Sequence, residues 1–484
     1  MVIERLMVLS GVSLSVAMKL IDREASGICF VIDGRRLVGV VTDGDIRRGL
    51  LDGKTLDMPV DSVMKKEFFT LPVNSSLKSI QEHLGEYKYI PILNEDGEFV
   101  DLASPDRYHQ IPLVQPVFDG NELEYVTDCI RTGWISSQGK YVRLFEEKFG
   151  EYVNCPNTLA VSNGTVALHL ALVTLGIGPG DEVIVPDLTF AAPINAILYV
   201  GATPVMVDVD RYTMAIDPGL LEGAITARTR AIIAVHLYGH PADMVGVMEL
   251  AEKNNLKVIE DCAEALGSRY KDVHVGSSGH ASIFSFFGNK TITTGEGGMV
   301  LFKDESMRER AKILRDHGMA PEKRYWHNEV GFNYRLTNIQ AAIGVAQLEK
   351  IETFVEKKRW MANHYNSCLA GIDSIQLPIE EEDVVNSYWL YTIVLEPNCV
   401  NMRDKILAFL NSKGVEARPV FFPLHIMPPY QGYNTHGSTY DVATHLSAGG
   451  ISLPSSVTVT QAEIERVCET LIFALTSDGS LVTS

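Results

Sequence analysis

The run Leu256-Lys-Val-Ile-Glu260, followed by Asp261, decides the fold, because it is a short apolar strand that ends on a carboxylate. Further strand-like runs share its length and composition, and helical patterns such as Val166–Leu175 and Met244–Asn254 lie between several of them. These runs are Glu182–Val185, Val205–Val209, Ala231–Val235, Ser282–Phe286 and Met299–Phe302. Short apolar strands that alternate with helices predict an α/β fold with a mostly parallel sheet covered on both faces.

Two prolines in Ile111-Pro-Leu-Val-Gln-Pro116 mark the start of this α/β part. We expect a large domain over residues 111–365, whose last segment is a long helical stretch, Asn338–Tyr365. A smaller C-terminal α/β domain is predicted for residues 366–484. Residues 1–110 form a separate part.

This first part contains an internal repeat of about sixty residues. Each copy has a helix-like stretch, a strand, a tight turn and a second strand. The first copy comprises Val12–Asp22, Gly27–Ile32, Asp33-Gly34 and Leu37–Val41, and the second comprises Leu77–Leu84, Tyr89–Leu93, Asn94–Gly97 and Phe99–Leu102. Each copy is too short to bury its own face, so the repeat predicts a paired module.

Composition excludes several classes of protein. Among 484 residues, 42 Lys and Arg stand against 61 Asp and Glu, which gives a net charge of −19 and argues against binding to nucleic acid or to anionic membranes. The 7 cysteines are scattered and form no CxxC pair, as expected of a reduced, cytosolic protein without a metal site. The sequence contains no run of 18 or more apolar residues, so no membrane span is predicted.

Polar groups follow the predicted strands at the points where ligands of parallel sheets bind. Ser162-Asn-Gly-Thr165 opens a helix and offers backbone amides and a hydroxyl to a phosphate, although ordinary N-capping is the favoured explanation of this motif in isolation. Asp261 ends its strand as either a helix cap or a functional carboxylate. Phe190 follows another strand end, where an aromatic ring can stack on a flat ligand or simply join the core.

The last of these groups is a lysine. Lys290 leaves a β-rich run, Ser285-Phe-Phe-Gly-Asn-Lys290, and enters a loop rich in Gly and Thr. Lysine forms Schiff bases when its pKa is lowered, and Ser285 could hold a phosphate of the same ligand. A phosphate site, a stacking ring, a carboxylate and a lysine together match the needs of pyridoxal 5′-phosphate (PLP).

Residues 111–484 resemble the DegT-type sugar-nucleotide aminotransferases, which are PLP enzymes of fold type I. The resemblance rests on five motifs in combination. These are Gly133-Trp-Ile-Ser136, Ser162-Asn-Gly-Thr165, Glu260-Asp-Cys-Ala-Glu264, Ser285 to Lys290 with Thr294-Gly-Glu-Gly-Gly298, and Gly331-Phe-Asn-Tyr-Arg335. The family's dehydratases carry histidine in place of the lysine, so Lys290 implies transamination.

The resemblance implies a role for each motif residue. Lys290 would bond the cofactor and carry the proton, and Asp261 would pair with its pyridine nitrogen. The cofactor's phosphate would be bound by Gly164, Thr165 and Ser285, its ring by Phe190, and Asn333 would reach that phosphate from the second subunit of a homodimer. Glu264 departs from the Gln or His of many members; an acid there has to be hydrogen-bonded or protonated to avoid repulsion from the cofactor's phenolic oxygen.

The implied reaction moves an amino group from L-glutamate to a nucleotide-linked 4-keto-6-deoxy sugar, for surface polysaccharide synthesis. Candidates for sugar-nucleotide contacts are Trp326, His327, Arg335 and His425, whereas His236 is expected to be structural. A UDP- or dTDP-linked keto sugar, aminated at C3 or C4, is an alternative substrate. A nucleotide-sensing regulator that has lost catalysis is an alternative of another class.

The N-terminal repeat resembles a CBS-domain pair. Thr42-Asp-Gly-Asp45 follows the second strand of the first copy, where the family places a hydroxyl and a carboxylate on an adenine nucleotide. The second copy has Arg107 where that Asp is expected, so at most one nucleotide site is predicted. The alternative is that Thr42 and Asp45 only cap the next helix.

Overall fold

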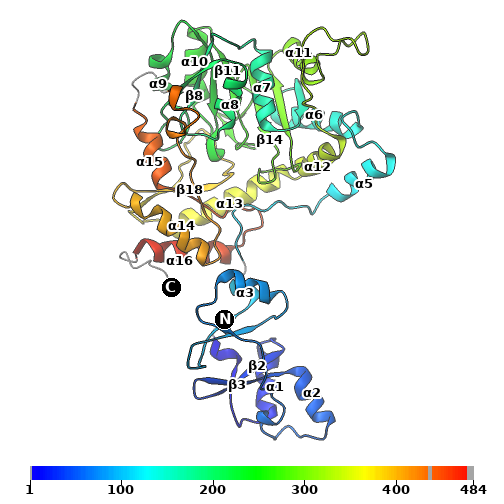
Figure 1. Ribbon diagram of the computed structural model, residues 1–484, viewed down its shortest axis with the longest axis vertical. Coiled ribbons are helices and arrows are strands. Elements are labelled where there is room, and N and C mark those ends of the chain that lie inside the picture. Colours follow the sequence, from blue (N-terminus) through cyan, green and yellow to red (C-terminus); the bar gives the residue numbers. More distant parts are fainter. Residues whose placement is uncertain (1–2, 109, 434–438, 477–484) are drawn as a thin grey trace. The chain divides into compact units, whose positions relative to one another are not determined.

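The computed structural model describes residues 3–108, 110–433 and 439–476. The chain forms two compact units and passes from the first to the second between Gln110 and Ile111 (Figure 1). Within the described residues, no helix is both long and apolar enough to cross a bilayer.

The first unit is built from two similar halves. In each half a short strand pairs in parallel with the first strand of an antiparallel hairpin, and helices follow the first and third strands. The first half contains η1 (Ile3–Leu6), β1 (Met7–Leu9), α1 (Leu14–Arg23), β2 (Ile28–Asp33), β3 (Arg36–Thr42), α2 (Asp43–Leu51) and η2 (Val60–Ser62). The second contains β4 (Leu71–Pro72), α3 (Leu77–Leu84), β5 (Ile90–Leu93), β6 (Phe99–Ala103) and α4 (Pro105–Tyr108).

Both hairpins have the turns that the sequence predicts. Gly34 and Gly97 adopt φ values of +61° and +75°, a backbone region that glycine enters without steric cost. The described halves therefore repeat one element order. The short strands β1 and β4, which contribute only a few residues each, were not anticipated from the alternation of apolar residues.

A seven-stranded sheet forms the centre of the second unit, in the order β7-β15-β14-β11-β10-β8-β9. Its strands are β7 (Thr158–Val161), β8 (Glu182–Pro186), β9 (Thr203–Val207), β10 (Thr229–Val235), β11 (Lys257–Asp261), β14 (Ala281–Ser285) and β15 (Gly298–Phe302). All are parallel except β15, which runs antiparallel to both of its neighbours. The mostly parallel sheet predicted from the alternating runs is confirmed.

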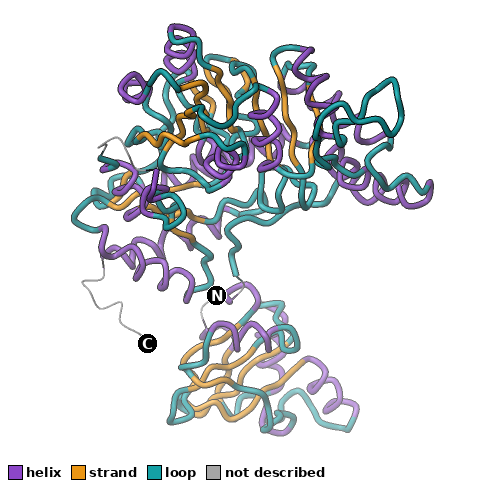
Figure 2. Tube along the Cα trace, turned by 45° about the horizontal axis from the view of Figure 1, so that its top comes forward, coloured by secondary structure: helices purple, strands orange, loops and turns teal. Residues whose placement is uncertain are grey.

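Helices cover both faces of this sheet, as Figure 2 shows. Val183 and Val185 of β8 face one core cluster, whereas Ile184 between them faces the other. Because side chains alternate along a strand, burial on both faces requires the continuous apolar runs seen in the sequence. The helices around the sheet are α5 (Glu122–Thr132), α6 (Lys140–Val153), α7 (Gly164–Thr174), α8 (Ala192–Tyr199), α9 (Pro218–Ala224), η3 (Leu237–Gly239), α10 (Met244–Lys253) and α11 (Glu305–Arg315).

The predicted helical stretch 338–365 consists of two helices, α12 (Asn338–Leu348) and α13 (Ile351–Leu369). The break falls at Lys350, whose φ of −111° and ψ of 3° depart from helical values. Its ammonium lies 2.7 Å from a carboxylate oxygen of Asp119 and of Glu122, which holds the junction against the start of α5 and the segment before it. Apolar periodicity continues across the break, so the pattern alone predicts one helix.

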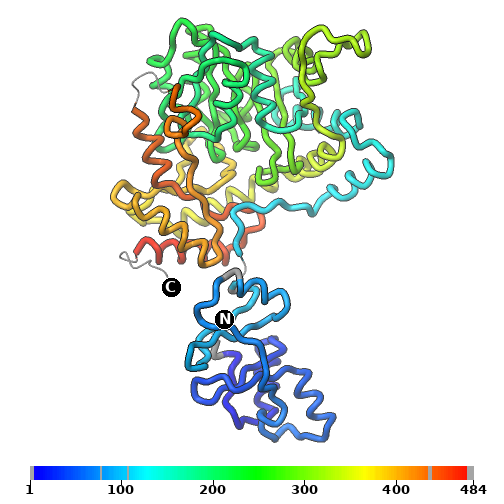
Figure 3. The backbone as a smooth tube through the Cα atoms, viewed as in Figure 1, coloured from blue at the N-terminus to red at the C-terminus, as the bar shows by residue number. Residues whose placement is uncertain are grey.

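The C-terminal part builds a second sheet with its own core, and the path of the chain into it can be followed in Figure 3. Its strands follow the order β16-β18-β20-β19. These are β16 (Ile375–Gln376), β18 (Tyr391–Leu395), β19 (Arg418–Pro419) and β20 (Gly450–Leu453); the helices are η4 (Val400–Met402), α14 (Arg403–Ser412), η5 (Leu424–Ile426), η6 (Gln431–Tyr433), α15 (Asp441–Gly449) and α16 (Gln461–Thr476). A small sheet joins β12 (Arg269–Tyr270), β13 (Val273–His274) and β17 (Val384–Val385). The division at residue 365 stays a prediction, because α13 runs through it.

Candidate active site

Asp261 lies at the carboxyl end of β11, near the middle of the seven-stranded sheet. The strand register places it between Val235 of β10 and Ile283 of β14. Its side chain is buried, and its Oδ1 accepts a hydrogen bond of 3.0 Å from the amide of Ala263. No other donor in the described part of the chain reaches its second oxygen. Burial, reinforced by the nearby Glu264 carboxylate, raises the pKa of Asp261 to about 6.

Lys290 lies in the loop that follows β14, and its amine contacts Glu264. The Lys290 Nζ is 3.3 Å from Glu264 Oε1, while Glu264 Oε2 accepts a hydrogen bond of 3.1 Å from the amide of Tyr238. Burial raises the pKa of Glu264, and the Lys290 ammonium opposes that rise. Glu264 is therefore hydrogen-bonded from two sides, which is one of the two ways in which an acid can be accommodated near a phenolic oxygen.

Gly164 and Ser285 come together because three strands align their ends. Val161 of β7 pairs with Gly298 of β15, and Gly298 pairs with Ser285 of β14. A Cβ atom on Gly164 would lie 3.0 Å from the Cβ of Ser285, so the helix start approaches the strand end as closely as glycine permits.

The first turn of α7 leaves donors open beside Ser285. The side chain of Asn163 caps the helix by accepting from the amide of Val166 at 3.0 Å. The amides of Gly164 and Thr165 and the Thr165 hydroxyl have no partner among the residues that the structure describes. Helix capping and anion binding are therefore compatible at this motif. Asn163 caps the helix, and the amides of Gly164 and Thr165 stay available to an anion.

Phe190 follows β8 and is 58% exposed, so the core reading of this residue is wrong. Its ring lies 5.7 Å from that of Phe421, which comes from the C-terminal part. Phe421 stacks on Tyr238, and Tyr238 stacks on Trp389 with ring planes 13° apart. The Lys290 Nζ lies 3.9 Å from the centroid of the Trp389 ring. Aromatic rings therefore form a continuous row between Phe190 and the lysine amine.

Trp389 and Tyr238 were not identified from the sequence. Trp389 is buried, and its Nε1 donates a hydrogen bond of 2.7 Å to the carbonyl of Asn289, directly before Lys290. Tyr238 adopts a left-handed backbone conformation with φ of +54°. A Cβ on the adjacent Gly239 would lie 2.9 Å from the amide of Trp389, which shows how closely the two loops approach. No spacing rule connects residues about 150 positions apart, so only the fold reveals this contact.

Three of the four substrate candidates, together with Asn333, lie in the loop between α11 and α12. Arg335 pairs with Asp316 and donates a hydrogen bond of 2.7 Å to Asn333 Oδ1. His327 Nδ1 lies 2.8 Å from the carbonyl of His317, and the Trp326 side chain is 53% exposed. No hydrogen bond or ion pair of the described chain joins Trp326, His327, Asn333 or Arg335 to Lys290.

His425, the fourth candidate, pairs with a residue that sequence reasoning passed over. Its Nδ1 lies 2.6 Å from Oδ2 of Asp187, a fully buried carboxylate directly after β8. Burial raises the pKa of Asp187, and the hydrogen bonds from His425 oppose that rise. Because Asp187 engages Nδ1, the imidazole presents Nε2 as its free edge.

His236 is structural, as expected. It is fully buried, its Nδ1 accepts from the amide of Ala242 at 2.9 Å, and its Nε2 lies 3.2 Å from Glu260. Together with Cys262, these two side chains are close enough to hold a metal ion. Glu260, however, already accepts hydrogen bonds from the amides of residues 276, 278 and 279. The cluster is better described as a hydrogen-bonded anchor for the turn before β14.

In the first unit, Thr42 and Asp45 form a capping box at the start of α2. The Asp45 amide donates to Thr42 Oγ1 at 3.2 Å, and Asp45 Oδ2 accepts from the Thr42 amide at 3.0 Å. Arg48 and Lys65 lie 2.5 Å and 3.5 Å from Asp45 Oδ1. These contacts match the capping alternative, and nucleotide binding at the same residues stays a prediction. The side chain of Arg107 in the second half lies outside the described residues.

The arrangement around Lys290 fits PLP. Asp261 has an oxygen without a partner for a protonated pyridine nitrogen, and the free α7 amides beside Ser285 suit a phosphate. Lys290 provides an amine that contacts Glu264, three residues after Asp261. We propose for these residues the roles that the motifs imply.

Comparison with protein families gives two matches. The model of the DegT/DnrJ/EryC1/StrS aminotransferase family matches residues 116–472, and the CBS domain model matches residues 3–52. GDP-perosamine synthase of Escherichia coli O157:H7 is 47% identical over 362 residues, covering 75% of this chain and 97% of the relative. GDP-perosamine synthase of Caulobacter vibrioides is 46% identical over 365 residues, with the same coverage of both proteins.

Solved structures agree with these matches. The Streptococcus pneumoniae protein Spr1654, assigned as a sugar aminotransferase, superposes in its PLP form with a TM-score of 0.73 at 30% identity, over 78% of this chain and 100% of the other. Helicobacter pylori PseC, an aminotransferase of pseudoaminic acid biosynthesis, gives a TM-score of 0.72 at 27% identity, over 75% and 99%. The chain therefore belongs to the DegT/DnrJ/EryC1/StrS family and is a PLP-dependent sugar aminotransferase with an N-terminal CBS domain.

Proposed function

We propose that this protein transfers the amino group of L-glutamate to a GDP-linked 4-keto-6-deoxy sugar and so forms a perosamine-type nucleotide sugar for a surface polysaccharide. The observation that carries the proposal is the likeness to two GDP-perosamine synthases at 47% and 46% identity, each over 97% of the relative. The contact of Lys290 with Glu264, beside the buried Asp261, supports it.

In this proposal the chain's own groups bind and move protons around the cofactor. PLP, when bound, supplies the electron sink that stabilises negative charge at the amino donor's α-carbon. Lys290 Nζ takes the proton that leaves the α-carbon of the amino donor and then delivers it to the atom next to the amino nitrogen on the other side. Asp261 would hold a proton on the pyridine nitrogen of PLP, because a cationic partner favours the ionised form of a buried carboxylate. Glu264 keeps the lysine amine in place when it is not bonded to the cofactor.

The remaining residues orient the ligands. Gly164, Thr165 and Ser285 bind the phosphate of PLP, and Phe190 covers its ring. Asn333 of a partner subunit completes the phosphate site in a homodimer. Trp326, His327, Arg335 and His425 are the candidates for the nucleotide sugar; a sugar diphosphate presents hydroxyl and phosphate oxygens, which imidazole and guanidinium groups bind.

A UDP- or dTDP-linked keto sugar is the alternative substrate. Mass spectrometry on a panel of GDP-, UDP- and dTDP-linked keto sugars, each incubated with holoenzyme and L-glutamate, decides between them. We expect the mass change of a ketone replaced by an amine with the GDP sugar, and release of 2-oxoglutarate in equal amount. Amination of a UDP or dTDP sugar in preference to the GDP sugar would contradict the proposal.

Substitution of the lysine tests the role of Lys290. Lys290→Ala should abolish both the visible absorbance of bound PLP and turnover, because the covalent link to the cofactor is lost. Lys303→Ala is the matched control, because Lys303 has an exposed side chain and follows the next strand, β15. Borohydride treatment followed by peptide mapping should place the cofactor on Lys290 in the parent and in the control. Full activity of Lys290→Ala would exclude the mechanism.

A further inference from the structure

A lysine outside the proposed catalytic set is completely buried. Lys358 of α13 is 1% exposed, and its ammonium donates hydrogen bonds of 3.1 Å to the carbonyl of Trp389 and 2.7 Å to the carbonyl of Ser455. Within the described residues, no carboxylate lies at ion-pair distance from it. Removing an ammonium from water without a counter-charge costs free energy, and burial lowers the pKa of Lys358 to about 7. A methionine would fill the same volume without that cost.

One of the two carbonyls, that of Trp389, connects Lys358 to the active site. The backbone of Trp389 is fixed by Lys358, and its ring is fixed by the hydrogen bond to the Asn289 carbonyl. The ring lies directly against the Lys290 amine, at 3.9 Å from centroid to Nζ. Trp389 thus contacts both lysines: its carbonyl accepts a hydrogen bond from Lys358, and its ring lies against the Lys290 amine.

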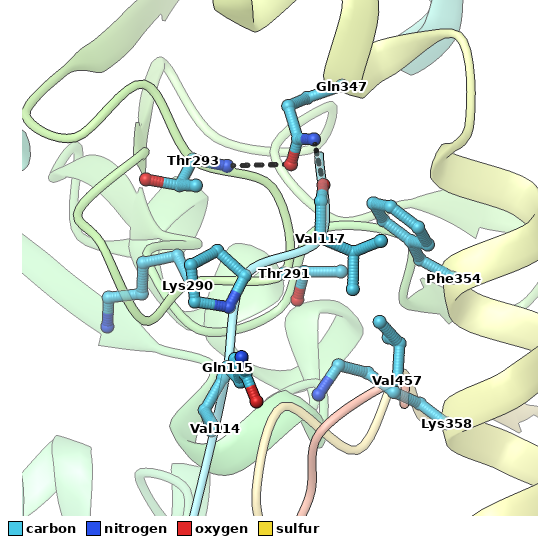
Figure 4. A pocket seen from close by; sticks show the side chains of 11 residues that line it. Val114, Gln115, Val117, Lys290, Thr291, Thr293, Gln347, Phe354, Lys358 and Val457 are labelled. Atoms are coloured by element: carbon cyan, nitrogen blue, oxygen red, sulfur yellow. Dashed lines mark hydrogen bonds between the residues drawn. The ribbon is translucent and has the colours of Figure 1, made fainter. Parts of the chain in front are cut away.

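Lys358 and Lys290 also line one small cavity of about 10 Å³. Figure 4 shows Lys358 reaching into it from α13, while Lys290 lies on the opposite side, beside Thr291. Gln347 closes the far end, where its amide group bonds the Val117 carbonyl and the Thr293 amide. The cavity has room for about one water molecule, so the buried Lys358 ammonium is not screened by bulk solvent there.

We propose that Lys358 is a positioning residue, which acts through Trp389 to fix the place of the Lys290 amine. The inference deepens the proposed function and rests on it, because it assigns the proton transfer to Lys290. An ammonium held over an indole ring in a desolvated site is attracted to the ring face, and this attraction depends on the geometry of the pair. Proton transfer is equally sensitive, since a misplacement of about 1 Å can slow a reaction on the order of 10²-fold.

A purely structural Lys358 would behave differently. The same hydrogen bonds tie α13 to the segments around residues 389 and 455, so a structural role predicts a change in thermal stability with unchanged kinetics. A positioning role predicts slower proton transfer in a folded holoenzyme. It also predicts that changes at Lys358 and Trp389 affect one and the same property.

The experiment uses the full-length holoenzyme and four variants. Lys358→Met removes the charge, Lys358→Gln keeps one set of donors, Trp389→Phe removes the indole, and the fourth variant combines Lys358→Met with Trp389→Phe. Lys357→Met is the matched control, because Lys357 is the preceding residue of α13 and its side chain is exposed. Rapid mixing with L-glutamate, and with glutamate deuterated at C2, follows the loss of cofactor absorbance in the first half-reaction. Visible circular dichroism reports the orientation of the cofactor before glutamate is added.

We expect Lys358→Met and Trp389→Phe each to slow the half-reaction about 10- to 100-fold, with an enlarged deuterium isotope effect and the same change in circular dichroism. The double variant should lose no more than the worse single variant, because the two residues act in series. Lys358→Gln should recover part of the rate, and Lys357→Met should match the parent.

Parental rate, isotope effect and circular dichroism in a folded Lys358→Met enzyme would overturn the inference. Multiplicative losses in the double variant would overturn it as well. If Lys358→Met does not fold, Trp389→Phe and Lys358→Gln still test the positioning role of Lys358. Unchanged circular dichroism in both of these variants would contradict that role. If the parent enzyme does not react with glutamate, only the proposed amino donor is contradicted. The circular dichroism of the variants tests the positioning of the lysine amine without any amino donor.

Discussion

The charges of the partly buried Lys290 and the buried Asp261 and Glu264 do not balance. Two carboxylates face one ammonium in the protein alone, so the site lacks one positive charge. Asp261 responds with a raised pKa. A protonated pyridine ring would supply the missing cation at the one carboxylate oxygen that has no donor. The same residues that sequence reasoning placed around PLP are thus electrostatically incomplete without a cationic ring.

Asp261→Asn should therefore have opposite effects on the cofactor-free and the loaded protein. The rise of the Asp261 pKa from 3.8 to about 6 means that the native state binds more protons than the unfolded chain in this range, so its contribution to stability is lost as the pH rises through about 6. At pH 7.5 the variant should gain up to about 3 kcal/mol in cofactor-free form. Below pH 4 the gain should vanish.

Thermal unfolding between pH 4 and 8, with and without PLP, checks this expectation. With PLP bound, the parent should unfold at the higher temperature, because only Asp pairs with a protonated pyridine nitrogen. Turnover of the variant should fall on the order of 10²-fold or more. A cofactor-free variant that is less stable than the parent at pH 7.5 would contradict this account of Asp261.

At the scale of elements, the site depends on the register of β7, β15 and β14. That register aligns Val161, Gly298 and Ser285, and it brings the start of α7 against the end of β14. Because β15 runs antiparallel, it returns the chain from the Lys290 loop into the sheet beside β7. The proposed phosphate site at Gly164, Thr165 and Ser285 therefore depends on the strand order, because the start of α7 alone would be an ordinary helix cap.

Gly164→Ala should weaken PLP binding about 10-fold, which corresponds to about 1.4 kcal/mol. The new Cβ would lie 3.0 Å from the Ser285 Cβ and 3.3 Å from its Oγ, so the start of α7 and the end of β14 have to move apart. Titration of the cofactor-free protein with PLP, followed by absorbance, measures the affinity. Gly223→Ala in α9 is the control, since nothing lies within 4 Å of a Cβ at that position. Equal affinities of the parent and Gly164→Ala would show that the close approach is not needed.

At the scale of the whole molecule, the second unit lacks contacts that the proposed chemistry needs. Trp326, Tyr325 and Val330 expose 53%, 73% and 88% of their surface in one loop, and Asn333 of the same loop bonds Arg335 instead of the proposed phosphate site of its own chain. A homodimer in which this loop enters the second subunit accounts for both features.

Mixing two inactive variants tests such sharing of the site. If Lys290 and Asn333 of different subunits form one site, co-refolded Lys290→Ala and Asn333→Ala chains should regain roughly a quarter of parental activity, since half of the dimers are hybrids with one intact site each. Size-exclusion chromatography confirms the dimer before the assay. Activity no higher than that of the separate variants would place Asn333 in the site of its own chain.

Local sequence patterns were sufficient to predict the mostly parallel sheet and the motif residues of the candidate site. Continuous apolar runs predicted a buried parallel sheet, because burial on both faces leaves no polar alternation. The motif residues Lys290, Asp261 and Ser162–Thr165 were found because each follows a strand or opens a helix, a position that is local in the sequence. The break at Lys350 was not found, since it depends on Asp119 and Glu122 from a distant segment.

The side chains that surround the lysine amine could be identified only from the packing of the folded chain. Trp389, Tyr238 and the buried Lys358 come from separate segments, and their contacts depend on how the C-terminal part packs on the sheet. The tertiary structure also paired His425 with Asp187 and engaged Thr42 in a cap. Contacts between residues remote in sequence carry no periodic signal, because packing of preformed elements creates them.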